Sequence, residues 1–398
     1  MTDVGTLVVG AGVAGSATAM HLAEHGERVA VVDPDLEGGR SSSELNAGGV
    51  RATWWQPVNV ELCAVTIEFL RDHAEEVGLR PRGYLWLYPP GRWDEAVRAT
   101  ELQNRFGRRV ELLRPAEVTA RWPFLDRMDG VAGATFSPLD GLVNANAVKE
   151  LYRRRAVEAG ATFLDRRALV DSDPAARSAT LAEVADRDES YALLEGGAPS
   201  GAREVVSYGR VVNAAGPWAA GVAELLGYRV PCRAVRRQVS IVASRDVDLS
   251  ECGMIVDSSD AYFHHEGGEH ILAGYSPPGD PPGYRFDYDG RRFFEAEIWP
   301  RLAARSSTLD RLEHIRGWAG LYELSPDNSA LVGAAHGGPA SVFEIHSFSG
   351  RGVMQSYAAG LSLAELMLDG AHRSFPSAAA LSGARFFEGR SVPEELHI

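Results

Sequence analysis

The chain has 398 residues, of which 45% are hydrophobic and 24% charged, a balance that excludes disorder, collagen and coiled coil as its main architecture. Its 40 basic and 54 acidic residues give a net charge of −14, which argues against nucleic acid as a partner. No apolar run reaches the roughly 18 residues of a membrane span, and the first residues lack the basic start of a signal peptide. The three cysteines, Cys63, Cys232 and Cys252, are too few for a disulfide framework, so we expect a cytoplasmic protein.

The basic residues include a single lysine, Lys149, and the other 39 are arginine. Codon bias explains such a composition. It still has a chemical consequence, because any mechanism that needs a lysine must use Lys149. We expect this lysine to lie on the protein surface, in a helix that ends before Gly160.

The chain begins with a strand, a glycine-rich turn, a helix and a second strand. Residues 6–9 and 29–32 are short apolar runs typical of buried parallel strands, and residues 14–25 have helical spacing. The turn, residues 10–15, reads GAGVAG, and Asp33 follows the second strand. This order of elements predicts a site for a dinucleotide.

Each residue of this pattern has a physical role. We expect Gly10 to allow the tight turn, Gly12 to let the backbone approach a pyrophosphate, and Gly15 to let the helix pack closely on the strand. The carboxylate of Asp33 suits ribose hydroxyls and disfavours a 2′-phosphate. The pattern therefore disfavours NADP and leaves FAD and NAD open.

The remaining elements follow in chain order. We expect helices at residues 62–77, 145–159, 293–303 and 353–368. We expect strands at residues 83–88, 205–213, 237–243 and 261–274, and a loop at 277–283. Glycine-rich loops recur near residues 213–218 and 347–352, which indicates a nucleotide-binding domain made of separate segments. We assign residues 1–85, 142–230 and 319–398 to this domain, and residues 86–141 and 231–318 to a substrate-binding domain.

Four stretches resemble, in order and spacing, the D-amino acid oxidase-like flavoprotein family, which includes sarcosine oxidase, glycine oxidase and dimethylglycine dehydrogenase. They are the glycine turn with Asp33, residues 42–51 (SSELNAGGVR), residues 211–219 (VVNAAGPWA), and residues 318–327 (WAGLYELSPD) with 348–355 (FSGRGVMQ). The resemblance implies an α/β fold with an α+β substrate part. A Rossmann-like FAD-binding domain of discontinuous segments would then carry an inserted substrate domain with a mixed, largely antiparallel sheet.

The resemblance also implies FAD as the cofactor. Relatives attach it covalently at the positions of Asn46 or Gly320, so we expect non-covalent FAD here. The cofactor-binding residues implied are Gly10, Gly12, Val13, Ala14, Gly15, Asp33, Pro34, Arg40, Ser42, Ser43, Ala47, Gly48, Gly49, Val170, Ala214, Ala215, Gly216, Trp218, Gly320, Tyr322, Gly350, Arg351, Gly352, Val353 and Met354. We expect no metal site.

The catalytic residues implied are Arg51, Tyr262, Tyr322 and Gln355. Arg51 is the candidate clamp for a substrate carboxylate, or alternatively a flavin or structural contact. Leu272 and Met354 replace lysines that sarcosine oxidases use. The electron acceptor therefore stays open between O2, with His264, His265 or water assisting, and another acceptor.

The resemblance implies oxidation of a C–N bond in an amine or amino or imino acid, with hydride transfer to flavin N5 and an imine as product. Secondary amines, such as N-methyl or cyclic amino acids, are slightly favoured, and the reaction could be a tailoring step of secondary metabolism. Two alternatives remain: oxidation of the C–O bond of a hydroxyacid, and a non-catalytic FAD-binding assembly protein.

Overall fold

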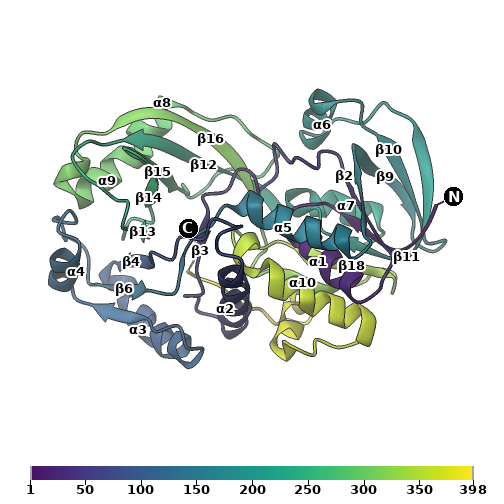
Figure 1. The fold of residues 1–398 in the computed structure, drawn as a ribbon, viewed down its shortest axis with the longest axis horizontal. Coiled ribbons are helices and arrows are strands. Elements are labelled where there is room, and N and C mark those ends of the chain that lie inside the picture. The colour runs from purple at the N-terminus through teal and green to yellow at the C-terminus, as the bar shows by residue number, and fades with distance from the viewer. Residues whose placement is uncertain (1, 397–398) are drawn as a thin grey trace.

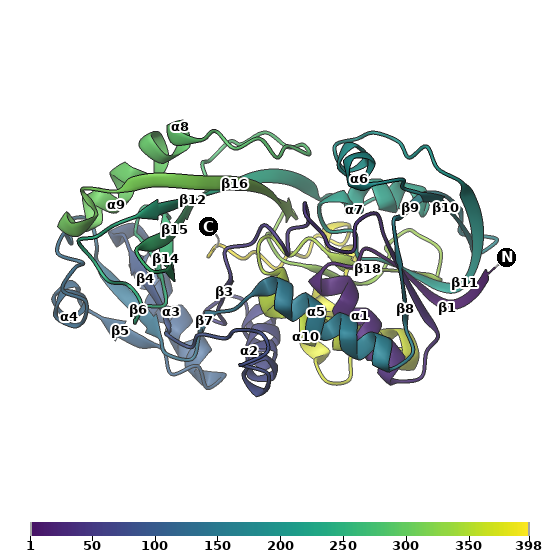
Figure 2. The same cartoon turned by 45° about the horizontal axis from the view of Figure 1, so that its top comes forward.

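The computed structural model describes residues 2–396, which form two lobes, each built around one eight-stranded sheet (Figure 1). One sheet has the strand order β17-β18-β11-β1-β2-β8, with β10 and β9 continuing from β11. The other has the order β16-β12-β15-β14-β13-β4-β6-β5. A small pair, β3 (Gly49–Val50) and β7 (Gly141–Leu142), lies between them (Figure 2).

The first sheet is parallel at its centre. β1 lies between β2 and β11 and pairs with both in parallel. The next strands outwards are also parallel: β18 pairs with β11, and β8 pairs with β2. Leu7, Val8 and Val31 have no exposed surface, as expected for parallel strands covered on both faces. The strands are β1 (Thr2–Val9), β2 (Val29–Asp33), β8 (Thr162–Asp165), β9 (Arg167–Asp173), β10 (Ser178–Glu183), β11 (Arg203–Asn213), β17 (Leu331–Ala334) and β18 (Val342–His346).

Helices α1 (Val13–Glu24), α5 (Ala145–Glu158), α10 (Gly352–Asp369) and α2 (Pro57–Asp72) pack together on this lobe (Figure 1). A side chain at Gly360 of α10 would lie 3.0 Å from Ala17 of α1, so the glycine lets the two helices approach closely. Helices α6 (Arg187–Leu194) and α7 (Ala219–Leu225) lie on the other side of the lobe (Figure 2).

The second sheet is antiparallel except for the pair β13 and β4. One of its faces packs Leu87, Phe263 and Ile271 against Ile298 and Leu302 of the helical segment 291–305. The strands are β4 (Tyr84–Tyr88), β5 (Glu111–Leu113), β6 (Gly133–Ser137), β12 (Arg233–Ala243), β13 (Met254–Val256), β14 (Tyr262–Gly267), β15 (His270–Tyr275) and β16 (Glu313–Leu324). The predicted fold class, an FAD-binding lobe of separate segments with an inserted mixed and mostly antiparallel sheet, is confirmed.

Several predicted elements differ from the structure in detail. Helix α2 begins five residues before the predicted start of 62, because Pro57 occupies its first turn, and it ends at Asp72. The predicted strand 261–274 is a hairpin of β14 and β15, which turns at Gly267 and Gly268. Helix α3 (Pro90–Arg105) and the long strand β16 were not among the predicted elements. The domain limits stay a prediction, and β4, β7 and β16 each cross one of them.

Candidate cofactor and substrate site

A cavity of about 560 Å³ lies at the carboxyl ends of β1, β2 and β11 and extends to the second sheet. This is the edge of an open α/β sheet at which ligands bind. Its walls come from the glycine turn, the loop at 33–49, the turn at 214–218, strands β12, β14 and β16, and the start of α10. Both lobes therefore contribute to one continuous site.

The glycine turn at one end of the cavity fits a pyrophosphate. Gly10 has a φ of 106°, and a side chain there would collide with the carbonyl of Ala214. A Cβ atom at Gly12 would lie 3.6 Å from its nearest neighbour, the hydroxyl of Ser43. The backbone of Gly12 therefore faces the cavity. The N-terminal N–H groups and positive dipole end of α1 follow directly, and these favour phosphate oxygens.

Asp33 lines the same end of the cavity, at the end of β2. Its Oδ2 accepts a hydrogen bond from the N–H of Ala11 at 2.7 Å, and its Oδ1 accepts one from Asp35 at 2.9 Å. Each oxygen keeps acceptor capacity for a ribose hydroxyl. Burial raises the pKa of Asp33 to about 6, although these two N–H groups and Lys149 act in the opposite direction.

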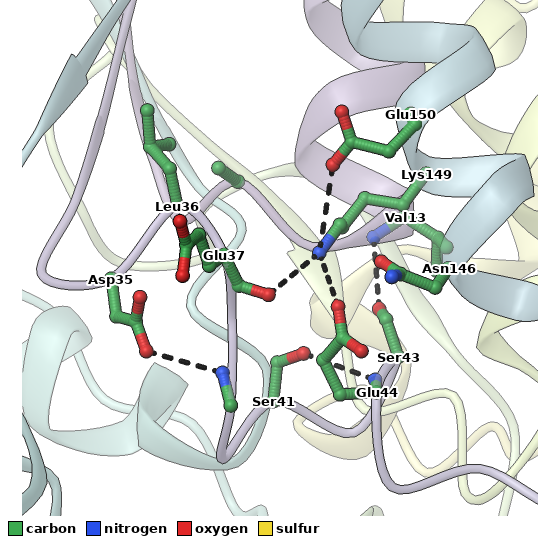
Figure 3. Close-up of polar contacts among 12 residues, drawn as sticks. Val13, Asp35, Leu36, Glu37, Ser41, Ser43, Glu44, Asn146, Lys149 and Glu150 are labelled. Atoms are coloured by element: carbon green, nitrogen blue, oxygen red, sulfur yellow. Dashed lines mark hydrogen bonds and ion pairs between the residues drawn. The ribbon is translucent and has the colours of Figure 1, made fainter.

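Lys149 is buried, so its predicted surface position is wrong: its side chain is only 2% exposed. Its Nζ lies 2.7 Å from Oε1 of Glu44 and 3.3 Å from the carbonyl oxygen of Glu37 (Figure 3). Both partners belong to the loop at 33–49. The hydroxyl of Ser43, in the same loop, accepts a hydrogen bond from the N–H of Val13 (Figure 3). The lysine therefore holds a loop that lines the cavity, and it is not available for chemistry at the far end.

The cavity wall includes most of the predicted cofactor-binding residues. These are Gly10, Gly12, Val13, Ala14, Asp33, Pro34, Arg40, Ser42, Ser43, Ala47, Gly49, Ala214, Ala215, Gly216, Trp218, Gly320, Tyr322, Gly350, Gly352, Val353 and Met354. Four others lie outside that wall. Gly15 packs α1 against the glycine turn, Gly48 lies behind Gly49 with a φ of 75°, Val170 follows the lining residue Leu169, and Arg351 is buried.

Arg51 borders the cavity, but the structure commits its guanidinium to the protein. Nη1 donates to the carbonyl of Thr53 at 2.8 Å and Nη2 to the carbonyl of Leu396 at 2.9 Å. The guanidinium also lies 3.4 Å from the ring centre of Trp54, and the residue is 1% exposed. These contacts fit the structural role considered for Arg51 and use two of its five N–H groups, and the carboxylate clamp stays a prediction.

Gln355 lies on α10 and Arg351 at its start, and neither is among the residues that line the cavity. Gln355 is buried and donates to the side-chain oxygen of Asn59 on α2 at 3.0 Å. The guanidinium of Arg351 lies 4.7 Å from the ring centre of Trp54, and burial lowers its pKa to about 10. The structure therefore separates Gln355 from the other predicted catalytic residues.

Tyr262 and Tyr322 do come together at the far end of the cavity, joined there by Tyr84. They belong to β14, β16 and β4, which lie in one sheet. Burial raises the pKa of all three phenols, so they stay neutral and keep their O–H donors at neutral pH.

Arg237 on β12 also lines this end of the cavity and was not among the predicted site residues. It pairs with Gly320 across β12 and β16, and its guanidinium lies 5.3 Å from the ring centre of Tyr322. Nη1 donates to the carbonyl of Arg236, and Nε is buried without a hydrogen-bond partner. Burial lowers the pKa of Arg237, while Tyr322, Asp280 and Tyr262 oppose that shift.

The sequence signal for Arg237 was the arginine pair at 236 and 237. Successive strand residues point to opposite faces, so one arginine had to face each side of β12. Arg236 takes the other face, where its guanidinium pairs with Asp287 and Asp289. The predicted strand 237–243 begins at Arg237 and omits Arg236, so the alternation of the two arginines shows only with the full length of β12, Arg233–Ala243.

His264, considered for oxygen activation, is buried behind the cavity. Its ring nitrogens lie 2.9 Å from the carbonyl of Ala47 and 2.8 Å from that of His265. Burial lowers its pKa to about 4, so its imidazole is neutral at neutral pH. Within residues 2–396 no group of three side chains is placed to hold a metal ion, and no helix is long and apolar enough to cross a membrane.

The fold and this cavity define an α/β protein with a dinucleotide-binding site and an inserted sheet domain. The chain belongs to the FAD dependent oxidoreductase (DAO) family, whose model matches residues 6–366. Its fold is similar to that of L-proline dehydrogenase from P. horikoshii (TM-score 0.84, 23% identity, 98% of this chain and 99% of that one). It is also similar to glycine oxidase from Geobacillus kaustophilus (TM-score 0.78, 21% identity, 97% and 99%).

Relatives that are similar in sequence include the following two. FAD-dependent oxidoreductase domain-containing protein 1 of Xenopus laevis is 28% identical over 98% of this chain and 83% of its own length. The 4-methylaminobutanoate oxidase (formaldehyde-forming) of Paenarthrobacter nicotinovorans is 24% identical over 93% of this chain and 44% of its own length.

Proposed function

We propose that this protein oxidises the C–N bond of an amino or imino acid with FAD as the electron acceptor. The observation that carries the proposal is Arg237, a cavity-lining arginine whose buried Nε has no partner, next to three neutral tyrosines. Similar proteins named as L-proline dehydrogenase, glycine oxidase and 4-methylaminobutanoate oxidase, all acting on carboxylates that carry an amine, support it.

The other arginines of the cavity have acidic partners or more than one bond to the protein, whereas Arg237 donates to one carbonyl, that of Arg236. Arg40 pairs with Glu195, Arg51 binds two backbone carbonyls, and Arg167 lies near Glu183 and Glu204. A carboxylate is the natural partner of a guanidinium with an unused N–H, because the pair forms charge-assisted hydrogen bonds. Arg237 therefore suits the acid group of the substrate better than the other three.

The neighbouring side chains suit the rest of such a substrate. The aromatic faces of Tyr84, Tyr262 and Tyr322 and the side chains of Met254 and Met354 exclude water around an aliphatic amine carbon. The neutral phenols can hydrogen-bond a carboxylate or an uncharged amine. When bound, FAD supplies the two-electron acceptor, and the chain's own residues bind the acid group, orient the amine carbon and keep the site dry.

The cofactor itself would be held without a covalent bond. None of the described residues that line the cavity is a cysteine or a histidine, the usual attachment residues of the relatives considered above. Cys63, Cys232 and Cys252 are free thiols outside the lining. Acid or heat denaturation should release all of the yellow colour into the soluble fraction, and colour that stays on the precipitated chain would contradict non-covalent binding.

Anaerobic flavin reduction tests the proposed function. The holoprotein is mixed with matched pairs that differ only in the acid group, such as proline and pyrrolidine, or sarcosine and dimethylamine. We expect the visible absorbance band of the oxidised flavin to bleach with a carboxylate-bearing amine. Bleaching by hydroxyacids alone, or by no compound, would contradict the proposal. Admitting air then separates an oxidase, which reoxidises quickly, from a dehydrogenase.

Arg237→Gln is the matching variant, with Arg316→Gln on β16 as a control because Arg316 is an exposed arginine of the same sheet. We expect Arg237→Gln to weaken substrate binding roughly a hundredfold, the loss typical of a charged hydrogen-bonded pair. The variant should also show a smaller difference in flavin bleaching between amines with and without the acid group. If both amines of a matched pair bleached the flavin of the unaltered protein equally, Arg237 would not be the residue that binds the acid group.

A further inference from the structure

A buried carboxylate, that of Glu323, lines the cavity. Glu323 is the penultimate residue of β16, next to Tyr322, and lines the cavity. Its Oε1 accepts a hydrogen bond from the N–H of Phe348 at 3.2 Å. Its Oε2 is buried and has no hydrogen-bond partner. An unpaired carboxylate oxygen without access to water is costly, so a ligand donor is the expected partner.

The neighbours of Glu323 place it along the cavity. Oε2 lies 3.3 Å from the position that a Cβ atom at Gly216 would take. Gly216 belongs to the turn at 214–218, and Ala214 of this turn contacts Gly10 of the glycine turn. On its other side, Tyr322 packs against Gly350, just before α10. Glu323 therefore lies between the pyrophosphate end and the end that holds the tyrosines.

In FAD, the ribityl chain joins the pyrophosphate to the isoalloxazine ring. A ligand that spans the cavity must then place its ribityl chain near Glu323. The chemistry agrees, because ribityl hydroxyls donate hydrogen bonds to a carboxylate, whereas a phosphate beside the same group would repel it.

A second buried group supports a charged Glu323. His346 on β18 has no exposed surface, and its Nε2 lies 3.2 Å from Oε2 of Glu344. Desolvation lowers the pKa of His346, but hydrogen bonds and charges from Cys232 and Glu344 outweigh it and raise the pKa to about 10. The resulting imidazolium charge favours the ionised form of Glu323, which burial alone disfavours.

We propose that Glu323, backed by His346 and Glu344, is a cofactor-binding residue that accepts a hydrogen bond from a ribityl hydroxyl of FAD. The unpartnered Oε2, its place between Gly216 and Tyr322, and the donor chemistry of the ribityl chain carry this assignment. It rests on FAD as the cofactor and not on the identity of the substrate.

The test is FAD binding to the apoprotein, measured by quenching of flavin fluorescence. We expect Glu323→Ala to raise the Kd for FAD by roughly ten- to a hundredfold, the range for a hydrogen bond to a charged group. Glu323→Gln should bind with intermediate affinity and fold normally. Glu313→Gln, at the exposed start of the same strand, is the control and should bind like the unaltered protein.

FAD analogues that lack one ribityl hydroxyl, at the 2′, 3′ or 4′ carbon, identify the partner. One analogue should bind the unaltered protein more weakly than FAD does. The same analogue should bind Glu323→Ala with the same Kd as it binds the unaltered protein, because both changes remove the same hydrogen bond. Additive losses for all three analogues, or an unchanged Kd for both Glu323 variants, would overturn the assignment. If the unaltered protein itself bound no FAD, both this inference and the proposed function would fall.

Discussion

The ammonium of Lys149 on α5 lies 2.7 Å from Oε1 of Glu44, in the loop that forms one wall of the cofactor cavity, and the lysine side chain is 2% exposed (Figure 3). The two residues are 105 positions apart in the chain. The chain's single lysine thus fixes the loop at 33–49 against the helices of the FAD-binding lobe.

Lys149→Met should therefore weaken FAD binding. It removes the ammonium, leaves the carboxylate of Glu44 partly buried without a counter-charge, and loosens the loop that carries Ser42 and Ser43. We expect about a tenfold rise in the Kd for FAD. We also expect a lower melting temperature, with the free energy of unfolding reduced by roughly 2 kcal/mol. Arg153→Met on the same helix, which pairs with Glu150 at a more exposed site, should change neither. A normal Kd with Lys149→Met would show that the loop holds its shape without the lysine.

FAD binding should depend on pH through Asp33. Burial raises its pKa to about 6 in the apoprotein, so the carboxylate is protonated below this pH. Ribose hydroxyls bind the ionised form, so FAD lowers this pKa and affinity falls as pH decreases through 6, by up to about tenfold per pH unit. Titrations of apoprotein at pH 7.5, 6 and 5 measure this dependence.

Asp33→Asn is the control for that pH dependence. This variant should bind FAD more weakly at pH 7.5, and its Kd for FAD should change much less between pH 7.5 and 5 than that of the unaltered protein. Burial also raises the pKa of Glu323, so the double variant with Glu323→Gln tests whether this second carboxylate contributes to the pH dependence. A pH dependence identical in the unaltered protein and Asp33→Asn would exclude Asp33 as its source.

Trp218 joins the two lobes at the cofactor end of the cavity. Its ring lies 5.9 Å from that of Tyr284 and 6.5 Å from that of Phe286, both from the loop before α8 (Arg291–Phe293), and its indole N–H donates to the carbonyl of Leu194. Trp218→Ala should raise the rate of FAD dissociation about tenfold, because it opens this end and removes aromatic contacts of roughly 1 kcal/mol each.

Stopped-flow dissociation into excess riboflavin-binding protein or charcoal measures that rate. Trp299→Ala is the matched control, since Trp299 is 42% exposed and lies in α9 (Trp299–Arg305), outside the cavity. Equal dissociation rates for both variants would show that the aromatic contacts do not retain the cofactor.

The sequence predicted the parts of the site whose signals are local. Residues 10–15 and Asp33 are read from one strand, turn and helix, and α10 from its helical spacing; all of these lie where expected. Positions that depend on distant partners could not be predicted in this way. The predicted surface position of Lys149 is wrong because Glu44 binds it, and the contact of Arg51 with the carbonyl of Leu396 spans 345 residues. Periodicity places a residue on a face of its element, but it does not show which partner that face meets.

Acid should destabilise the protein through His21 of α1. Its Nε2 lies 3.1 Å from the carbonyl of Tyr357, so this nitrogen donates, and burial lowers its pKa from 6.5 to about 3. Below pH 6.5 the unfolded chain takes up a proton at this histidine and the native state does not, so stability falls as pH decreases towards 3. Between pH 7 and 5 this single residue accounts for roughly 2 kcal/mol.

His21→Gln keeps a donor for Tyr357 but does not titrate, so urea unfolding at pH 7 and pH 5 should show a smaller loss of stability than in the unaltered protein. His270→Gln, at an exposed position of β15, should leave the loss unchanged. His264, whose pKa burial lowers to about 4, contributes in the same direction, and the double variant with His264→Gln should flatten the dependence further. If His21→Gln loses as much stability as the unaltered protein over this range, the imidazole is protonated in the native state and the helix α1 tolerates its charge.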